Sequence, residues 1–324
     1  MINTTMSLKP GSFVYRKLLK CIICTSVLVT LVGVNPVQGQ SPLNSFETVD
    51  GVIIGVGAAL DVGLRLIKNK KPQSKEFRTR GAFEQTAINN LSLTAKKHSD
   101  IILRGFTPAA TVGSHFLYDD PERSIYLNLQ TIIITDVANL LAKKLIQRAR
   151  PFTYRPEVVH TLPACKAYNK DHPDANLSFY SGHTSHVASF VFFANSMLWF
   201  YKPDYRSQGW AWIVSGLLPA AVGYQRVMAG KHFPSDVMAG YLIGAAIGYM
   251  VPRFHENESY ESDLTTDFLT GLGVGLLAQY ALIRFVGKNR KVSHDCMDQS
   301  KRIDWNISPT LGPYSGLKLS LRFN

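Results

Sequence analysis

Seven long apolar stretches, joined by polar connectors, constrain the fold of this chain more than any other feature of its sequence. They cover approximately residues 49–67, 101–117, 124–148, 184–201, 208–229, 235–252 and 265–286. None of them alternates apolar and polar residues as a half-buried strand does, so each stretch predicts a helix. We therefore expect an all-α fold built as a helical bundle.

Length and composition leave two interpretations of these helices open. The last four stretches contain apolar runs of about 15–17 residues, slightly fewer than the roughly 20 that a membrane span needs. They are either short membrane spans or core helices of a large soluble bundle. The connector 198–212 places Trp and Tyr beside Lys and Arg, a composition typical of a bilayer interface, which favours a membrane-embedded bundle.

The charge of the chain excludes one class of partner. Lys and Arg number 35 against 23 Asp and Glu, which gives a formal net charge of +12. The basic residues form no continuous stripe, and the sequence contains no nucleic-acid-binding motif. Nucleic acid is therefore not an expected partner.

The first forty residues predict an export signal. Four basic residues precede an apolar run at 21–34, and small residues at 37–39 stand before Gln40. This order is typical of a cleaved secretory signal peptide, here residues 1–39. The alternative is an uncleaved membrane anchor, although a run of about 14 residues is short for a span.

Export would place the chain in a bacterial-type cell envelope, with the active site facing the periplasm. Cleavage would leave Cys165 and Cys296 as the cysteines of the mature chain. Because that compartment is oxidising, we hypothesise a disulfide between Cys165 and Cys296.

Four segments are expected along the chain. They are the signal peptide 1–39, an N-terminal helical and basic segment 40–98, a catalytic helical domain 99–286 and a C-terminal tail 287–324. Residues 317–323 alternate apolar and polar side chains, which predicts a small β-hairpin in the tail.

The first apolar stretch differs from the other six. Asp50, Asp61 and Arg65 interrupt it, and a charge at mid-bilayer costs about 2.5–3.5 kcal/mol. We expect it to stay outside the bilayer, which leaves about six core helices as spans. The basic segment 68–80 would then lie outside, where it either attracts anionic lipid headgroups or is a solvated loop.

Three short clusters contain residues suited to phosphate chemistry. The first is Lys143-x6-Arg150-Pro151 at the end of the third stretch. A spacing of seven residues is two helical turns, so Lys143 and Arg150 project from nearly the same face. Taken alone, this is ordinary for a helix end, because cations are favoured near a helix C-terminus.

The second cluster, Ser181-Gly182-His183, opens the fourth stretch. Ser181 is a natural N-cap, and the free amides that follow it can bind an anion. His183 can transfer a proton to a group bound there. A Ser-Gly cap is also common without any such function.

The third cluster is Arg226-x5-His232-x3-Asp236, between the fifth and sixth stretches. A carboxylate that accepts a hydrogen bond from one imidazole nitrogen leaves the other nitrogen free as a nucleophile. We expect Asp236 to hold His232 in this way, and Arg226 to donate to phosphate oxygens. If the helices alternate in direction, all three clusters meet at one end of the bundle and form a phosphate site.

These three clusters resemble the pattern of the type 2 phosphatidic acid phosphatase (PAP2) superfamily, which also contains vanadium haloperoxidases. That pattern is K-x6-RP, then PSGH, then SR-x5-H-x3-D, and the resemblance covers about residues 100–255. Tyr180 replaces the proline and Gln225 replaces the serine of the pattern. We expect these two changes to affect substrate range more than chemistry.

The resemblance implies a role for each matching residue. His232 would attack phosphorus and form a phosphohistidine, Asp236 would orient His232, and His183 would protonate the leaving oxygen. The residues that would hold the phosphoryl oxygens are Lys143, Arg150, Ser181, Gly182 and Arg226. No metal or other cofactor is implied, and His186, one turn after His183, lacks the further ligands of a metal site.

The sequence therefore predicts a metal-independent phosphatase that acts on phosphomonoester or pyrophosphate groups. The favoured substrate is an envelope lipid such as phosphatidate, a polyprenyl pyrophosphate or a lipid A phosphate, which makes the membrane an expected partner. Three alternatives stay open. One is a soluble periplasmic acid phosphatase acting on small phosphoesters, and another is a vanadium-dependent haloperoxidase. The third is a non-enzymatic envelope protein that keeps the pocket but not turnover.

Overall fold

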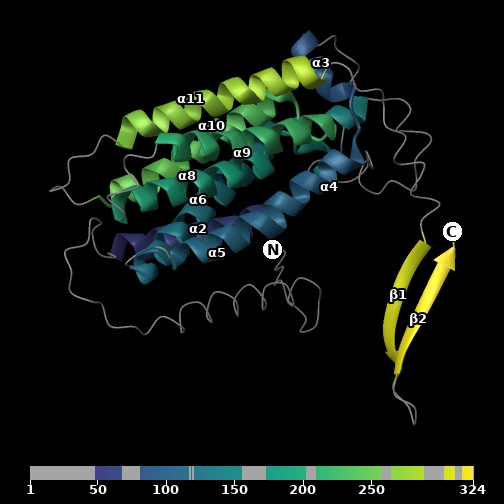
Figure 1. Ribbon diagram of the computed structural model, residues 1–324, viewed down its shortest axis with the longest axis horizontal. Helices are drawn as coiled ribbons and strands as arrows, with labels where there is room; N and C mark the ends of the chain where they lie inside the picture. The colour runs from purple at the N-terminus through teal and green to yellow at the C-terminus, as the bar shows by residue number, and fades with distance from the viewer. Residues whose placement is uncertain are drawn as a thin grey trace, which may run out of the picture. The chain divides into compact units, whose positions relative to one another are not determined.

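The computed structural model describes residues 48–67, 81–116, 118, 120–154, 173–201, 209–256, 264–287, 303–310 and 316–323. Most of these residues are helical, which confirms the prediction of an all-α bundle. The long helices lie side by side in Figure 1. The predicted signal peptide, the basic segment 68–80 and both Cys165 and Cys296 lie outside the described residues.

The α-helices are α2 (Thr48–Leu66), α3 (Ala82–Ile88), α4 (Leu93–Ile101), α5 (Thr107–His115), α6 (Pro121–Ile146), α8 (Gly182–Tyr201), α9 (Gly209–Met228), α10 (Pro234–Phe254) and α11 (Leu264–Ala281). Short helical turns are η1 (Ile102–Phe106), η2 (Pro151–Tyr154), η4 (Pro173–Asn176) and η6 (Leu282–Val286). The second apolar stretch belongs to a helix that begins earlier than expected, because the Ser92 hydroxyl accepts from the Ala95 amide and caps α4. Helix α4 therefore crosses the expected domain boundary at 98/99.

The core helices alternate in direction. Helices α8 and α10 run parallel, because Gly240, Gly244 and Gly248 of α10 contact Ser181, Ser185 and Ser189 of α8 in the same order. Their first residues lie at the end of the bundle where α6 and α9 finish. The three sequence clusters therefore meet at this end, which is called the site end below.

A row of glycines sets the spacing between α8 and α10. A Cβ at Gly240 would lie 2.6 Å from the Ser181 carbonyl oxygen, and one at Gly244 or Gly248 would overlap the carbonyl oxygen of Ser185 or Ser189. Helices α9 and α11 meet in the same way where Gly216 faces Gly271 and Gly275. Small residues that let backbones approach closely are the usual means of packing helices inside a membrane.

Helix α2 lies lengthwise along α6 and runs parallel to it. Near its start, the Asp50 carboxylate accepts from Gln130 of α6 and from His255, both at 2.7 Å. Near its end, Arg65 pairs with Asp61 of its own helix and with Asp136 of α6. The charge of Asp50 is therefore paired inside the bundle, whereas the Arg65 side chain is paired but 53% exposed. The expectation that the stretch 49–67 stays out of the bilayer stays a prediction.

Three helical segments are long and apolar enough to cross a membrane: Pro121–Tyr154, Pro234–Phe254 and Thr265–Val286. They correspond to three of the six predicted spans. Among the residues that the structure describes, no other helix meets the same criterion, so spans at 101–117, 184–201 and 208–229 stay predictions.

The tail contains two strands, β1 (Ile303–Thr310) and β2 (Gly316–Phe323), which pair antiparallel with Ile303 opposite Phe323. Nothing beyond this pairing supports the expected C-terminal hairpin, which stays a prediction.

The glycine row yields a prediction about stability. We expect Gly244→Ala to lower the thermal unfolding temperature of the detergent-solubilised protein, because the added methyl group overlaps the Ser185 carbonyl oxygen and pushes α10 away from α8. The matched control is Gly273→Ala on α11, where a Cβ meets nothing within 4 Å. There we expect no loss, or a gain of up to about 1 kcal/mol from helix propensity. Equal effects at both positions would contradict the close packing of α10 on α8 at Gly244.

Candidate active site

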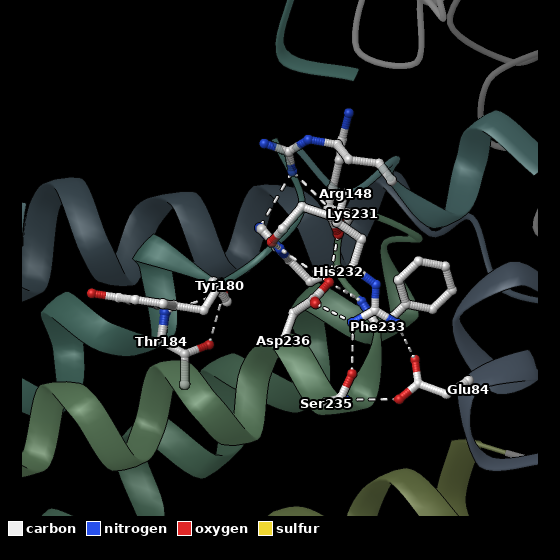
Figure 2. A network of polar contacts seen from close by, with 12 residues as sticks. Glu84, Arg148, Tyr180, Thr184, Lys231, His232, Phe233, Ser235 and Asp236 are labelled. Atoms are coloured by element: carbon white, nitrogen blue, oxygen red, sulfur yellow. Dashed lines mark hydrogen bonds and ion pairs between the residues drawn. The ribbon is translucent and has the colours of Figure 1, made fainter. Parts of the chain in front are cut away.

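The imidazole of His232 is the centre of the polar network at the site end (Figure 2). His232 lies in the turn between α9 and α10 and is 2% exposed. Its Nδ1 is 2.7 Å from the Ser178 carbonyl oxygen, and its Nε2 is 3.3 Å from Arg150 Nη1. A carbonyl only accepts and a guanidinium only donates, so these partners require a proton on Nδ1 and a lone pair on Nε2. Nε2 therefore carries the lone pair of the ring.

The surroundings of His232 keep the ring neutral. Burial lowers its pKa well below the usual value, and the positive charges of Arg150, Arg226 and Lys143 lower it further. A neutral imidazole carries the lone pair that nucleophilic attack requires. The ring is thus neutral at neutral pH.

The Asp236 carboxylate does not bind His232 directly, contrary to our expectation. Asp236 Oδ2 lies 4.0 Å from His232 Nδ1. This oxygen instead accepts from Ser178 Oγ at 2.5 Å and from the Phe233 amide at 2.9 Å. The first turn of α10 directs the carboxylate to these donors, so Asp236 acts on His232 through Ser178.

Arg148 and Glu84 complete the surroundings of Asp236. Arg148 donates to Asp236 Oδ1 at 2.5 Å and to Glu84 at 2.9 Å, and its guanidinium stacks on the Phe233 ring. Glu84 of α3 also accepts from the Ser235 amide at 3.2 Å, near the start of α10. Figure 2 shows Glu84 and Ser235 on one side of this network, with Asp236 between them and His232.

The start of α8 lies beside Lys143. Ser181 is fully buried and caps the helix, with its hydroxyl accepting from the Thr184 hydroxyl at 3.0 Å and, more weakly, from the Thr184 amide. A Cβ at Gly182 would lie 3.3 Å from Lys143 Nζ. Glycine therefore allows the lysine to approach the helix N-terminus, where backbone amides and the helix dipole favour an anion.

The remaining predicted residues, His183 and Arg226, are joined by Asp100 of α4. Asp100 Oδ1 is 2.7 Å from His183 Nε2 and 3.2 Å from Arg226 Nη1. The structure thus brings together all eight residues predicted from the three clusters. It adds Asp100, which no local pattern in the sequence indicates.

Arg150 is held by main-chain carbonyls. Its Nε donates to the Asp174 carbonyl at 2.8 Å and its Nη1 to the Lys231 carbonyl at 3.0 Å. The Lys231 ammonium lies over the Phe152 ring, and burial together with the charges of Arg150 and Arg226 lowers the pKa of Lys231 to about 6. The amine can therefore take up a proton when an anion enters the site.

Sequence reasoning missed the residues that orient the predicted ones: Glu84, Asp100, Arg148, Ser178 and Lys231. Arg148 and Lys231 stand beside cluster residues and carry charge, which is the one signal that could have found them. Among the described residues, no group of three or more His, Cys, Asp and Glu side chains is placed to hold a metal ion.

Comparison with known families agrees with this geometry. Residues 126–260 match the model of the PAP2 superfamily. This segment contains the clusters at 143–151, 181–183 and 226–236, but not Glu84 or Asp100.

Three relatives are lipid phosphatases by name. The undecaprenyl-diphosphatase BcrC of Bacillus subtilis is 30% identical over 38% of this chain and 55% of its own length. The lipid A 4'-phosphatase of Porphyromonas gingivalis is 24% identical over 39% of this chain and 48% of its own length. Phosphatidylglycerophosphatase B of Bacillus subtilis is 28% identical over 36% of this chain and 51% of its own length. The chain thus spans about half the length of these relatives, and no solved structure matches it.

The Arg148 pairing yields a prediction. Arg148→Met leaves the fully buried Asp236 carboxylate without its cation, so we expect a loss of about 3–5 kcal/mol in unfolding free energy, read as a drop in thermal midpoint. The matched control is Arg123→Met, because Arg123 is similarly exposed but pairs with the more open Asp120 at 3.4 Å. There we expect about 0–1 kcal/mol. If both variants lower the thermal midpoint equally, the buried Asp236 carboxylate does not need Arg148 for its stability.

Proposed function

We propose that the chain, whose residues 126–260 match the model of the PAP2 superfamily, is a phosphoric-ester hydrolase that removes phosphate or pyrophosphate groups from envelope lipids through a phosphohistidine on His232. The observation that carries the proposal is the His232 ring, whose Nδ1 is held by a carbonyl while Nε2 faces Arg150. A buried neutral imidazole with an accessible lone pair suits nucleophilic attack better than a structural role.

The proposed reaction has two steps. Lys143, Arg150, Arg226 and the amides at the start of α8 bind the phosphoryl oxygens and neutralise the charge that develops on them. His232 Nε2 attacks phosphorus as the bond to the ester oxygen breaks, and His183 gives its proton to that oxygen. Water then attacks the phosphohistidine, His183 takes the proton from the water, and phosphate leaves.

A lipid substrate is supported by the fold and by the relatives. Three segments are apolar enough to span a membrane, and the three relatives are named for undecaprenyl diphosphate, lipid A and phosphatidylglycerophosphate. We propose an integral membrane protein whose site end faces the periplasm. Lipid headgroups at that surface would then reach the site without crossing the bilayer.

The division of roles between the two histidines is testable. We expect His232→Ala to abolish phosphate release from every substrate, because the covalent intermediate cannot form. His183→Ala should slow phenyl phosphate and lipid substrates by about 10²-fold or more while sparing p-nitrophenyl phosphate, whose phenolate leaves with little protonation. Phosphate release by the purified protein, measured across a panel of lipids and small esters, gives these rates.

Two further readouts separate the alternatives. Vanadate should inhibit a phosphatase, whereas vanadate-dependent bromide oxidation would indicate a haloperoxidase. EDTA should leave the rate unchanged, because side chains supply the positive charge of the proposed mechanism. Equal loss with both substrate types in the two histidine variants would reject the division of roles.

The parallel packing of α2 on α6 predicts the membrane topology. If α6 crosses towards the periplasm, α2 lies at the same depth and begins on the opposite side. A signal cleaved after Gly39 would instead leave Gln40 outside, and the eight residues before Thr48 span at most about 29 Å when extended, so they barely match the bilayer core. Insertion of α2 and cleavage at this position therefore exclude each other.

Cysteine labelling decides between these topologies. In a background without the native cysteines, a membrane-impermeant reagent applied to spheroplasts should label Ser74→Cys and leave Thr48→Cys and Ser207→Cys protected. Labelling of Thr48→Cys together with Ser74→Cys would place α2 outside the bilayer. Labelling at all three positions would indicate a soluble periplasmic protein.

A further inference from the structure

Asp100 stands outside the segment that matches the PAP2 superfamily, yet its carboxylate binds two residues of the proposed site. We infer that Asp100 is a positioning residue that sets the tautomer of His183, stabilises its protonated form and fixes the guanidinium of Arg226. This inference rests on the proposed function, because the tautomer of His183 matters for the reaction only if His183 transfers a proton.

The contacts of Asp100 fix the orientation of His183. A carboxylate accepts hydrogen bonds and does not donate, so the 2.7 Å contact requires that His183 Nε2 carries a proton. The other nitrogen, Nδ1, is then the atom that exchanges a proton with the leaving oxygen or with water. Without the carboxylate, the ring could rotate or adopt the other tautomer.

The same carboxylate holds two cations in place. Arg226 donates to Asp100 Oδ1 at 3.2 Å and to the Ser99 hydroxyl at 3.2 Å, while Lys96 donates to Asp100 Oδ2 at 2.6 Å. Arg226 is 5% exposed on its side chain and Asp100 is 19% exposed. Asp100 thus links the second and third clusters from a helix that belongs to neither.

Helix α4 is fixed well enough to serve this purpose. The Ser92 amide donates to the Met228 carbonyl at the end of α9, and the Ser92 hydroxyl caps α4. A π-helical turn, η1, starts at Ile102, two residues after Asp100, and such turns are frequent at functional sites. The first turn of α4 is therefore anchored to the end of α9, eight residues before Asp100.

Asp100 remains ionised across the physiological range. Burial raises its pKa, but hydrogen bonds from His183 and Lys96 and the charge of Arg226 outweigh burial and hold the pKa well below its usual value. The charged groups that face His183 are Asp100 of α4, Arg226 of α9 and Lys143 of α6, and Lys96 and Lys231 face Asp100. Burial and the charge of Arg226 lower the pKa of His183 to about 3, and Asp100 is the one anion in this group that raises it, so removal of the carboxylate makes the protonated ring less stable still.

The test compares two substrates of similar size that differ in the leaving group. In Asp100→Asn, we expect kcat to fall about 10-fold or more with phenyl phosphate and less than about threefold with p-nitrophenyl phosphate. The alkaline limb of the kcat profile with phenyl phosphate should also move to lower pH, because the acid form of His183 loses its counter-charge. Asp100→Glu, which keeps a carboxylate, should restore part of the rate and the position of that limb.

Asp61→Asn is the matched control. Asp61 also pairs with a basic residue one turn away on its own helix and is 21% exposed, but it lies on α2 and contacts none of the site residues named above. We expect its kcat, its substrate ratio and its pH profile to match the wild type. A change equal to that of Asp100→Asn would mean that loss of an ion pair alone explains the effect.

The outcomes separate this inference from the proposed function. A wild-type protein that releases no phosphate, or a His232→Ala variant that keeps its rate, rejects the proposed function itself. An active protein in which Asp100→Asn changes both substrates equally, or neither, rejects the role of Asp100 alone. If Asp100→Asn does not fold, Asp100→Glu alone decides, since displacement of the carboxylate should still slow phenyl phosphate selectively.

Discussion

The backbone contact between α8 and α10 is the constraint on which the candidate site depends. The second cluster opens α8 and the third cluster ends in the first turn of α10, so the spacing of these two helices sets the distance between Ser181 and Asp236. Gly240 lets the Ser181 backbone approach closely, and the Ser181 amide donates to the Asp236 carbonyl at 3.0 Å. A larger side chain in this row would separate the start of α8 from His232. The glycines are thus as necessary to the geometry as the polar residues, although they take no part in the chemistry.

The positive charges of the site repel one another in the empty protein and would help to bind a phosphate group. Arg148 is neutralised by Asp236 and Glu84, but the half-buried Arg150 lies close to the half-buried Lys143 and to the buried Lys231. Gathering buried cations is unfavourable unless anions accompany them. Burial lowers the pKa of His232 and the charges of Arg150 and Lys143 lower it further, so the ring stays neutral, and a phosphate group would relieve the repulsion on binding. Substrate affinity and nucleophile activation would then come from one set of charges.

The sequence predicts the helices and the positions of the three clusters, but it does not predict contacts between residues that are distant in sequence. The helices, their alternation and the meeting of three clusters follow from apolar periodicity and from the placement of Lys143, His183 and His232 at helix ends. The partner of His232 could not be predicted, because it is a main-chain carbonyl and every residue has one. The i, i+4 spacing of His232 and Asp236 suggested a direct bond, whereas Ser178, distant in sequence, offered both a carbonyl to the ring and a hydroxyl to the carboxylate. Asp100 and Glu84 escaped for the same reason, since only the packing of α3 and α4 brings them to the site.

These acids also show why the N-terminal segment cannot be regarded as an appendage of a catalytic domain. Asp50, Glu84 and Asp100 all precede the segment that matches the PAP2 superfamily, and each accepts hydrogen bonds from residues within it. Asp50 binds Gln130 of α6 and His255 after α10. Glu84 binds Arg148, and Asp100 binds Arg226 and His183. Because each acid accepts from one or more of these donors, the family segment alone would leave the donors without these acceptors. The boundary expected at 98/99 therefore divides a single structural unit, and α4 crosses it at the point where the N-terminal segment reaches the site.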